Sequence, residues 1–325
     1  MAKITTLPTE LLAHIIDELT ITDPKRGYIH PPSRRDLKSL SHTCKLFFTL
    51  CFKPRMRHTP VLLTTFGVGV FKSGLAAGRG GDVVFIKVTS TGDGTDQSPL
   101  MELLSSLTLF PNTKHTSITY QTPLSLEPTI FTKILTTLPK NLTSLNLSIT
   151  IPPSSSTTHQ PPLPAPLPTI TTLTITTNHP IHIQTLHRLP PLFPNLKNLS
   201  ITFPESSLSQ NDWSLNTSHC TPLKRLKKLE HITLPWPRST RSEDPEVLAQ
   251  LFLSLLSTPE RDGIERLDNV EFYGEWVGQD GMLYDNRIII SYTKDRDGKW
   301  EYEFDGELIE GEEEVFGSDW DEEEE

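Results

Sequence analysis

Apolar residues near the amino end of the chain recur at helical spacing. Between residues 7 and 20 they recur at intervals of three, four and five positions, which gathers them on one broad face of an amphipathic helix. The residues are Leu7, Leu11, Leu12, Ile15, Ile16 and Leu19. Pro8 suits a first helical turn, where its missing N–H is not needed. Glu10 lies in the same turn and complements the positive end of the helix dipole. The pattern predicts a helix over residues 7–20 with a wide apolar stripe.

A second helical pattern follows a polar, proline-rich loop (residues 21–33). It covers residues 34–50 through Leu37, Leu40, Cys44, Phe47 and Phe48. Ser33 is a candidate cap for this helix, and Lys53–Pro54 is predicted to end it. About fifty residues make a small core, yet this segment carries more aliphatic surface than its helices can bury among themselves. We therefore expect an exposed apolar helix face of the kind that marks an obligate interface.

Residues 60–300 carry a different pattern, in which apolar residues recur as L-x-x-L-x-L. The copies are Leu142-x-x-Leu145-x-Leu147, Ile170-x-x-Leu173-x-Ile175, Leu196-x-x-Leu199-x-Ile201, Leu229-x-x-Ile232-x-Leu234 and Leu267-x-x-Val270-x-Phe272, with a weak earlier copy at Ile118 and Tyr120. Successive anchors, from Ile118 to Val270, are 27, 28, 26, 33 and 38 residues apart. The first three spacings fall in the range of leucine-rich repeats, about 20–29 residues. The last two require insertions, which the polar stretches 204–222 and 235–262 supply.

Short helical patterns fall between these predicted strands, over residues 100–107, 130–138, 183–189 and 248–255. Prolines such as Pro111, Pro139 and Pro194 mark the passage from each helix into the next extended segment. Regular strand–helix alternation predicts parallel strands side by side with helices behind them. The expected fold class is therefore α/β, an irregular leucine-rich-repeat-like solenoid. An ordinary α/β domain with leucine-rich strands is the alternative.

The carboxyl end departs from this alternation. Residues 287–293 and 299–304 alternate polar and apolar positions around Asp297-Gly298, which predicts a β-hairpin that caps the last repeat. Residues 310–325 are too acidic to collapse and are expected to be disordered. Residues 152–168 are rich in proline and serine and predict an extended loop in place of a helix. The expected organisation is a helical domain (1–58), a repeat domain (59–283), a hairpin cap (284–309) and an acidic tail (310–325).

The amino-terminal pattern resembles a known family. Leu7-Pro8-x-Glu10-Leu11-Leu12-x-x-Ile15, followed by Asp36-Leu37-x-x-Leu40-Ser41-x-x-Cys44-x-x-Phe47, looks like an F-box. The resemblance covers about residues 5–55. Two features depart from the family pattern: residues 25–32 look like an insertion, and the tryptophan often found near the end of the motif is absent, with Phe52 or Met56 as substitutes. Repeats such as those of residues 60–300 resemble the irregular leucine-rich repeats that often follow an F-box, although the usual asparagine that closes each repeat is missing.

The F-box resemblance implies a role in protein recognition. The family docks on a Skp-type adaptor of cullin–RING (SCF-type) ubiquitin ligases, and the following repeats hold a target protein. By position, the implied adaptor contacts are Leu7, Pro8, Leu11, Ile15, Leu37 and Leu40, whereas Leu12, Ile16, Cys44 and Phe47 are expected to pack internally. A plain helical hairpin packed on the body of the protein is the alternative.

Charge and composition narrow the choice of function further. The net charge is −10, but 14 acidic residues and no lysine or arginine lie in residues 301–325, so residues 1–300 carry +4. With no strongly basic face and no long apolar run, we expect neither a nucleic-acid nor a membrane partner. The first apolar stretch contains Glu10, Asp17 and Glu18, unlike a secretory signal. We expect a cytoplasmic or nuclear location.

No pattern of catalytic residues emerges from the sequence. The glycines at 67–69 and 78–81 lack the spacing of phosphate-binding loops, and no G-x-S-x-G motif is present. His179 and His182 lack ligand-type neighbours at metal-binding spacing, so no metal, cofactor or catalytic activity is expected. The sequence favours a substrate-recognition subunit of a ubiquitin ligase. A repeat-based scaffold independent of ubiquitination and an enzyme with a site in residues 204–262 are the alternatives.

Overall fold

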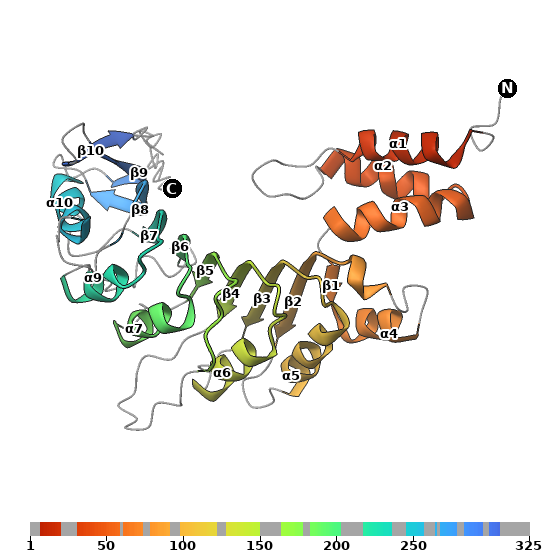
Figure 1. Cartoon of the computed structure of the whole chain (residues 1–325), viewed down its shortest axis with the longest axis horizontal. Coiled ribbons are helices and arrows are strands. Elements are labelled where there is room, and N and C mark those ends of the chain that lie inside the picture. The colour runs from red at the N-terminus through yellow and green to blue at the C-terminus, as the bar shows by residue number, and fades with distance from the viewer. Residues whose placement is uncertain are drawn as a thin grey trace, which may run out of the picture.

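The computed structural model describes most of the chain, in stretches separated by gaps. The described residues are 7–20, 31–58, 61–73, 79–91, 98–121, 128–149, 164–177, 183–202, 217–235, 245–256, 264, 267–277, 283–294 and 299–305. They form a mixed α/β structure built on one open sheet of ten strands (Figure 1). The predicted acidic tail, the hairpin turn at Asp297-Gly298, and His179 and His182 lie outside the described residues.

Helices α1 (Thr9–Leu19), α2 (Pro31–Ser41) and α3 (Lys45–His58) pack together at the amino end, and we call them the N-terminal helical group. Their shared core is small and consists of Leu12, Ile16, Leu37, Phe47 and Cys51. The helix predicted over residues 7–20 is confirmed by α1. Pro8 precedes it, and the Pro8 carbonyl accepts a hydrogen bond from the Leu12 N–H at 3.1 Å.

The second predicted helix is two helices, because the chain turns between Ser41 and Lys45. The Ser41 and Thr43 hydroxyls donate to the carbonyls of Lys38 and Leu40, each at 2.7 Å. These bonds satisfy carbonyl groups that the end of α2 leaves without helical partners, so the helix stops there. Ser33 lies within the first turn of α2 and not at the capping position before it.

Helix α3 runs through Pro54 to His58, so the prediction that Lys53–Pro54 ends the helix was wrong. A proline inside a helix removes one backbone hydrogen bond. Packing on two sides holds this part of α3: Cys51 lies in the core of the N-terminal helical group, and Phe52 lies in the core of the sheet. Burial of these side chains overrides the local preference of proline.

The strands lie in the sheet in chain order, from β1 to β10. Neighbours are parallel from β1 to β8, which confirms the prediction of side-by-side parallel strands, and antiparallel from β8 to β10. The strands are β1 (Val61–Leu63), β2 (Phe85–Thr91), β3 (His115–Gln121), β4 (Ser144–Ile149), β5 (Thr172–Thr176), β6 (Asn198–Thr202), β7 (His231–Pro235), β8 (Asn269–Val277), β9 (Leu283–Lys294) and β10 (Trp300–Asp305). The paired strands β9 and β10 match the predicted hairpin segments and extend the same sheet.

Helices occupy the connections between the parallel strands. They are α4 (Thr65–Ser73), the 3-10 helix η2 (Gly80–Asp82), α5 (Ser98–Ser105), the 3-10 helix η3 (Ser106–Leu109), α6 (Pro128–Thr137), α7 (Ile183–Leu192), α9 (Thr217–Lys224) and α10 (Pro245–Leu256). The four helices predicted from apolar spacing correspond to α5, α6, α7 and α10. Helices α5, α6 and α7 lie on one side of the parallel strands (Figure 1). Strands β1 and β2 and helices α4 and α9 were not predicted.

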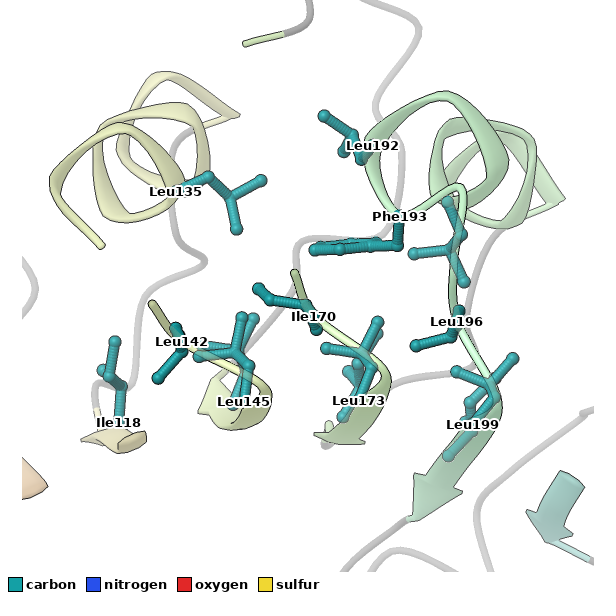
Figure 2. Close-up of a cluster of buried hydrophobic side chains, with 14 of the residues drawn as sticks. Ile118, Leu135, Leu142, Leu145, Ile170, Leu173, Leu192, Phe193, Leu196 and Leu199 are labelled. Atoms are coloured by element: carbon teal, nitrogen blue, oxygen red, sulfur yellow. The ribbon is translucent and has the colours of Figure 1, made fainter. Parts of the chain in front are cut away.

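The sheet buries its apolar residues in rows that cross the strands. Leu145, Leu173, Leu199, Ile232 and Val270 are successive Cα partners, as the repeat anchors predicted. On β3 the partner of Leu145 is Thr116, so the anchor at Ile118 was two residues too late. Figure 2 shows the aliphatic side chains of Leu145, Leu173 and Leu199 on the same side of the strands as Leu135 of α6 and Leu192 of α7.

Tight turns before the strands are joined to one another by hydrogen bonds, and we call this series of turns the ladder. In each of these turns the fourth residue donates its N–H to the carbonyl of the first, as in Thr113 to Phe110 (3.2 Å) and Leu196 to Phe193 (3.2 Å). The third residue then donates its side chain to a main-chain carbonyl of the preceding turn. These bonds join Asn112 to Gly81 (2.8 Å), Asn141 to Pro111 (3.2 Å), Thr169 to Lys140 (3.1 Å) and Asn195 to Pro168 (2.9 Å). The L-x-x-L-x-L pattern did not reveal the role of these asparagines, because they precede the strands.

Candidate functional site

An apolar stripe lies exposed along α1. Leu7, Leu11, Ile15 and Leu19 are spaced four residues apart and are 39%, 51%, 38% and 36% exposed. On the inner side of the same helix Leu12 and Ile16 are fully buried. Helix α1 lies on the outer side of the N-terminal helical group, and α3 is nearest the strands (Figure 1). The stripe therefore faces solvent in this chain while the opposite side of α1 holds the helices together.

The residues assigned to adaptor contact by resemblance separate into two sets. Leu7, Pro8, Leu11 and Ile15 are exposed together on or next to α1. Leu37 is fully buried in the core of the N-terminal helical group, and Leu40 is half-buried against that core. The structure thus does not place Leu37 on the exposed stripe, because Leu37 packs in the shared core with residues of α1 and α3. Of the residues expected to pack internally, Leu12, Ile16 and Phe47 are buried and Cys44 is half-buried.

Helix α3 connects the N-terminal helical group to the sheet. Phe52 is buried with the sheet core, and half-buried Phe48 and Met56 pack against that core. The Arg79 guanidinium lies 4.7 Å from the centre of the Phe52 ring, a cation–π contact that joins α3 to the residue before η2. At the turn between α2 and α3, Arg55 donates to the Ser41 hydroxyl at 2.9 Å. Helix α3 thus contacts the sheet through Phe48, Phe52 and Met56 and contacts α2 through Arg55.

The side of the sheet opposite the apolar rows carries polar residues. Burial alternates along β5, β6 and β7, so every second residue points away from the helices. We call these outward residues of β3–β7 the polar face; they are His115, Ser117, Thr119, Ser144, Asn146, Ser148, Thr172, Thr174, Thr176, Asn198, Ser200, Thr202, His231 and Thr233. Hydroxyl, amide and imidazole groups make up this face, and it carries no carboxylate, ammonium or guanidinium group.

Side chains of the polar face and of the adjoining strand β8 bond to one another across the strands. The Asn198 amide donates to the Thr172 hydroxyl at 3.2 Å, and the hydroxyls of Thr176 and Thr202 are 2.8 Å apart. Between β7 and β8, His231 Nδ1 lies 3.0 Å from Asn269 Oδ1. These lateral bonds hold the side chains in fixed orientations, which reduces the entropy cost of binding a ligand.

His115 stays uncharged on this face. Burial lowers the pKa of the His115 imidazole below its ordinary value, and the nearby Lys114 ammonium lowers the pKa further. The ring also stacks on Phe85, with ring centres 4.4 Å apart and planes 9° apart. The neutral form is thus favoured near neutral pH, which preserves the uncharged character of the polar face.

One group of potential metal ligands lies where β7 and β8 begin. Ligand atoms of Glu230, His231 and Asp268 all lie within 4.8 Å of one another, and each residue is half-buried. The Lys197 ammonium already pairs with Glu230 at 2.7 Å, and His231 Nε2 is 3.9 Å from Asp268. A metal ion would have to displace Lys197 and draw the other two ligands together. The arrangement is better explained as an ion-pair network that links β6, β7 and β8.

The cysteines offer no activated nucleophile in the part of the chain described. Burial raises the pKa of the Cys51 thiol, an effect that the nearby Arg55 opposes only in part. A thiol held in its neutral form is a poor nucleophile. Within the described residues, α9 and α10 contribute no member to the group of potential metal ligands.

Comparison with models of known protein families gives no match, and no curated protein shows significant similarity to the chain. Within the described residues, no helix combines the length and the apolar character needed to cross a membrane.

Proposed function

We propose that this protein is a substrate-recognition subunit of a cullin–RING (SCF-type) ubiquitin ligase. In this proposal residues 1–58 are an F-box that docks on a Skp-type adaptor, and the sheet that follows is an irregular leucine-rich-repeat solenoid that holds a target protein. The protein performs no bond chemistry itself. It supplies proximity, which lowers the barrier to ubiquitin transfer when the target lysine is correctly placed.

The observation that carries the proposal is the exposed stripe on α1. A helix that packs only against its own chain would bury its apolar residues. On α1, Leu12 and Ile16 pack inward, but Leu7, Leu11 and Ile15 remain exposed. An exposed apolar row beside a small core is typical of a segment that a second protein covers. The stripe includes three of the six residues that the F-box resemblance assigns to the adaptor, namely Leu7, Leu11 and Ile15.

The area of the stripe sets a limit on what it contributes. Complete burial of an aliphatic side chain is worth about 1.5–3 kcal/mol, and the four stripe residues have roughly 40% of their surface left to bury. Their combined gain is therefore about 2–5 kcal/mol, which is of the order of the cost of association. Stable capture then requires further contacts around the stripe. Half-buried Leu40, which packs against the core of this group, is an apolar candidate for such a contact.

Copurification tests the proposal directly. Tagged full-length chain, expressed in eukaryotic cells, is expected to bring down a Skp-type adaptor and a cullin, and a chain that lacks residues 1–58 is expected to bring down neither. Binding of purified adaptor to purified chain, measured by calorimetry, then checks that the contact is direct. If the full chain binds no adaptor in either assay, the ligase proposal is wrong and the scaffold alternative gains.

A further inference from the structure

One row of polar side chains crosses most of the sheet without a break. His115 on β3 is followed by its Cα partners Ser144, Thr172, Asn198 and His231, and then by Asn269 on β8, Ser291 on β9 and Glu303 on β10. On the carboxyl side of this row, a second row from Ser117 to Thr233 and a third from Thr119 to Thr202 continue the same chemistry. Eight strands spaced about 4.8 Å apart give the row a length of about 34 Å, which an extended segment of about ten residues would span.

The two ends of this surface carry opposite charge. Glu271 on β8 lies on the same side of the sheet as the row, as do the exposed residues Glu301 and Glu303 on β10. Within the described chain, no ion pair engages Glu301 or Glu303. At the other end, Lys87 is exposed on β2 and is the Cα partner of Ser117. The strands between these ends present hydroxyl and amide groups and the imidazoles of His115 and His231.

We propose that this surface binds an extended peptide segment of a partner protein, with uncharged polar residues at its middle and lysine or arginine at the end that lies over β8–β10. Serine, threonine, asparagine, glutamine and glycine suit the middle, because hydroxyl and amide groups both donate and accept hydrogen bonds. A charged residue in the middle would lose water without gaining an opposite charge. The opposite end of the segment favours aspartate or glutamate beside Lys87.

The same observations disfavour other ligands. The described aromatic rings on this side of the sheet are the imidazoles of His115 and His231, Phe85, which is buried against His115, and half-buried Tyr273, whose hydroxyl donates to Ile201; they do not form the row of exposed rings on which successive bases stack. It also lacks the arginine and lysine side chains that neutralise phosphate. The lateral bonds between neighbouring side chains favour a ligand that accepts a surface already formed. This inference deepens the proposed function, since it names the target segment, and relies on that function only for the role of the binding.

Selection from a displayed library of random dodecapeptides against the immobilised full chain tests the proposal. Enriched peptides are expected to share an uncharged polar centre with a basic cluster at one end. A fluorescent copy of the most enriched peptide is then titrated in an anisotropy assay. The double charge reversal E301K/E303K is expected to weaken binding by about ten- to thirtyfold, because two attractive pairs become repulsive. A peptide with its basic end changed to glutamate should bind the reversed variant better than the original chain.

Two further variants locate the binding site. Asn146→Arg places a bulky cation on an exposed position of the polar face and is expected to weaken binding at least tenfold. Glu102→Lys makes a comparable charge change on α5, on the helix side of the sheet, and is expected to leave binding within about twofold. Circular dichroism of each variant confirms that it is folded.

Several outcomes would overturn the proposal. These are enrichment of acidic or aromatic peptides, no enrichment over a chain that carries Asn146→Arg, or equal binding by Asn146→Arg and the original chain. Dimerisation of the full chain in sedimentation, abolished by Asn146→Arg, would instead assign the face to a second copy of the protein. Adaptor capture depends on the α1 stripe and not on the polar face. If the chain still captures the adaptor but selects no peptide, only the inference about the peptide segment is refuted.

Discussion

Replacement of Leu11 by aspartate is the sharpest test of the α1 stripe. Leu11 is 51% exposed, so the folded chain loses only about half of the 1.5–3 kcal/mol that full burial of a leucine is worth. The helix should survive this loss, because Leu12 and Ile16 keep its inner side packed. In an adaptor complex the same change removes about 1 kcal/mol of apolar burial and places an unpaired carboxylate in the interface, at a cost of a further 2 kcal/mol or more. A total of about 3 kcal/mol corresponds to a loss of more than a hundredfold in affinity.

Calorimetric titration of purified adaptor into the Leu11→Asp chain measures this loss. Leu46→Asp is the matched control, since Leu46 is 37% exposed on α3 and lies off the stripe. It is expected to cost less than tenfold in affinity, and circular dichroism should show both variants folded. Equal binding by Leu11→Asp and the unmodified chain would refute the assignment of the stripe as a docking face. Equal loss in both variants would show that binding does not depend on the α1 stripe in particular.

Three further changes test the packing behind these surfaces. Leu37→Ala should destabilise the N-terminal helical group by about 2–5 kcal/mol in chemical denaturation, because Leu37 is fully buried, whereas Leu46→Ala should change stability by less than about 0.5 kcal/mol. Asn195→Ala removes the hydrogen bond that Asn195 donates to the Pro168 carbonyl and the one that it accepts from Lys228. The free energy of unfolding should fall by about 0.5–1.5 kcal/mol, and amide hydrogen exchange in β5–β7 should become faster. Asn146→Ala is the neutral control. The pKa of His115 is lower in the folded chain than its ordinary value of 6.5, so the unfolded chain binds a proton at His115 more readily and the fold loses stability as the pH falls below 6.5. Thermal melting between about pH 7.5 and 5.5 should therefore show less acid destabilisation for His115→Gln than for the original chain. An unchanged pH dependence would contradict this assignment.

Apolar spacing predicted the middle of the sheet well because each strand there repeats one local pattern. The anchors Leu145, Leu173 and Leu199 are in register as their sequence spacing indicated, since a one-residue slip would turn every leucine to the polar side. The copy on β3 was misaligned because Thr116 takes the buried anchor position, where a polar residue hides the pattern. Strand β1 spans only Val61–Leu63, too short for any periodicity to be recognised.

The exposed and buried sides of the N-terminal helical group were predicted less completely, because exposure depends on how the helices pack. The stripe residues Leu7, Leu11 and Ile15 could be identified from periodicity alone. The burial of Leu37 depends on how α2 packs against α1 and α3, which apolar spacing along one helix does not reveal. The polar face was not predicted for a similar reason. Serine, threonine and asparagine between the leucines show no functional pattern in the sequence, and only the register of β3–β7 aligns them in rows.

The ladder of turns before the strands determines where this protein can change in length. Each turn bonds to the turn before it and the turn after it, so the residues that begin a strand cannot shift without breaking contacts on both sides. The connections from β6 to β7 and from β7 to β8 are longer than the earlier ones, yet the strand starts remain in contact: Lys197 bonds Glu230, 33 residues on, and His231 contacts Asn269, 38 residues on. Evolution can therefore lengthen these connections freely, or add and delete whole strand–helix units, and so enlarge the polar face by one strand width at a time.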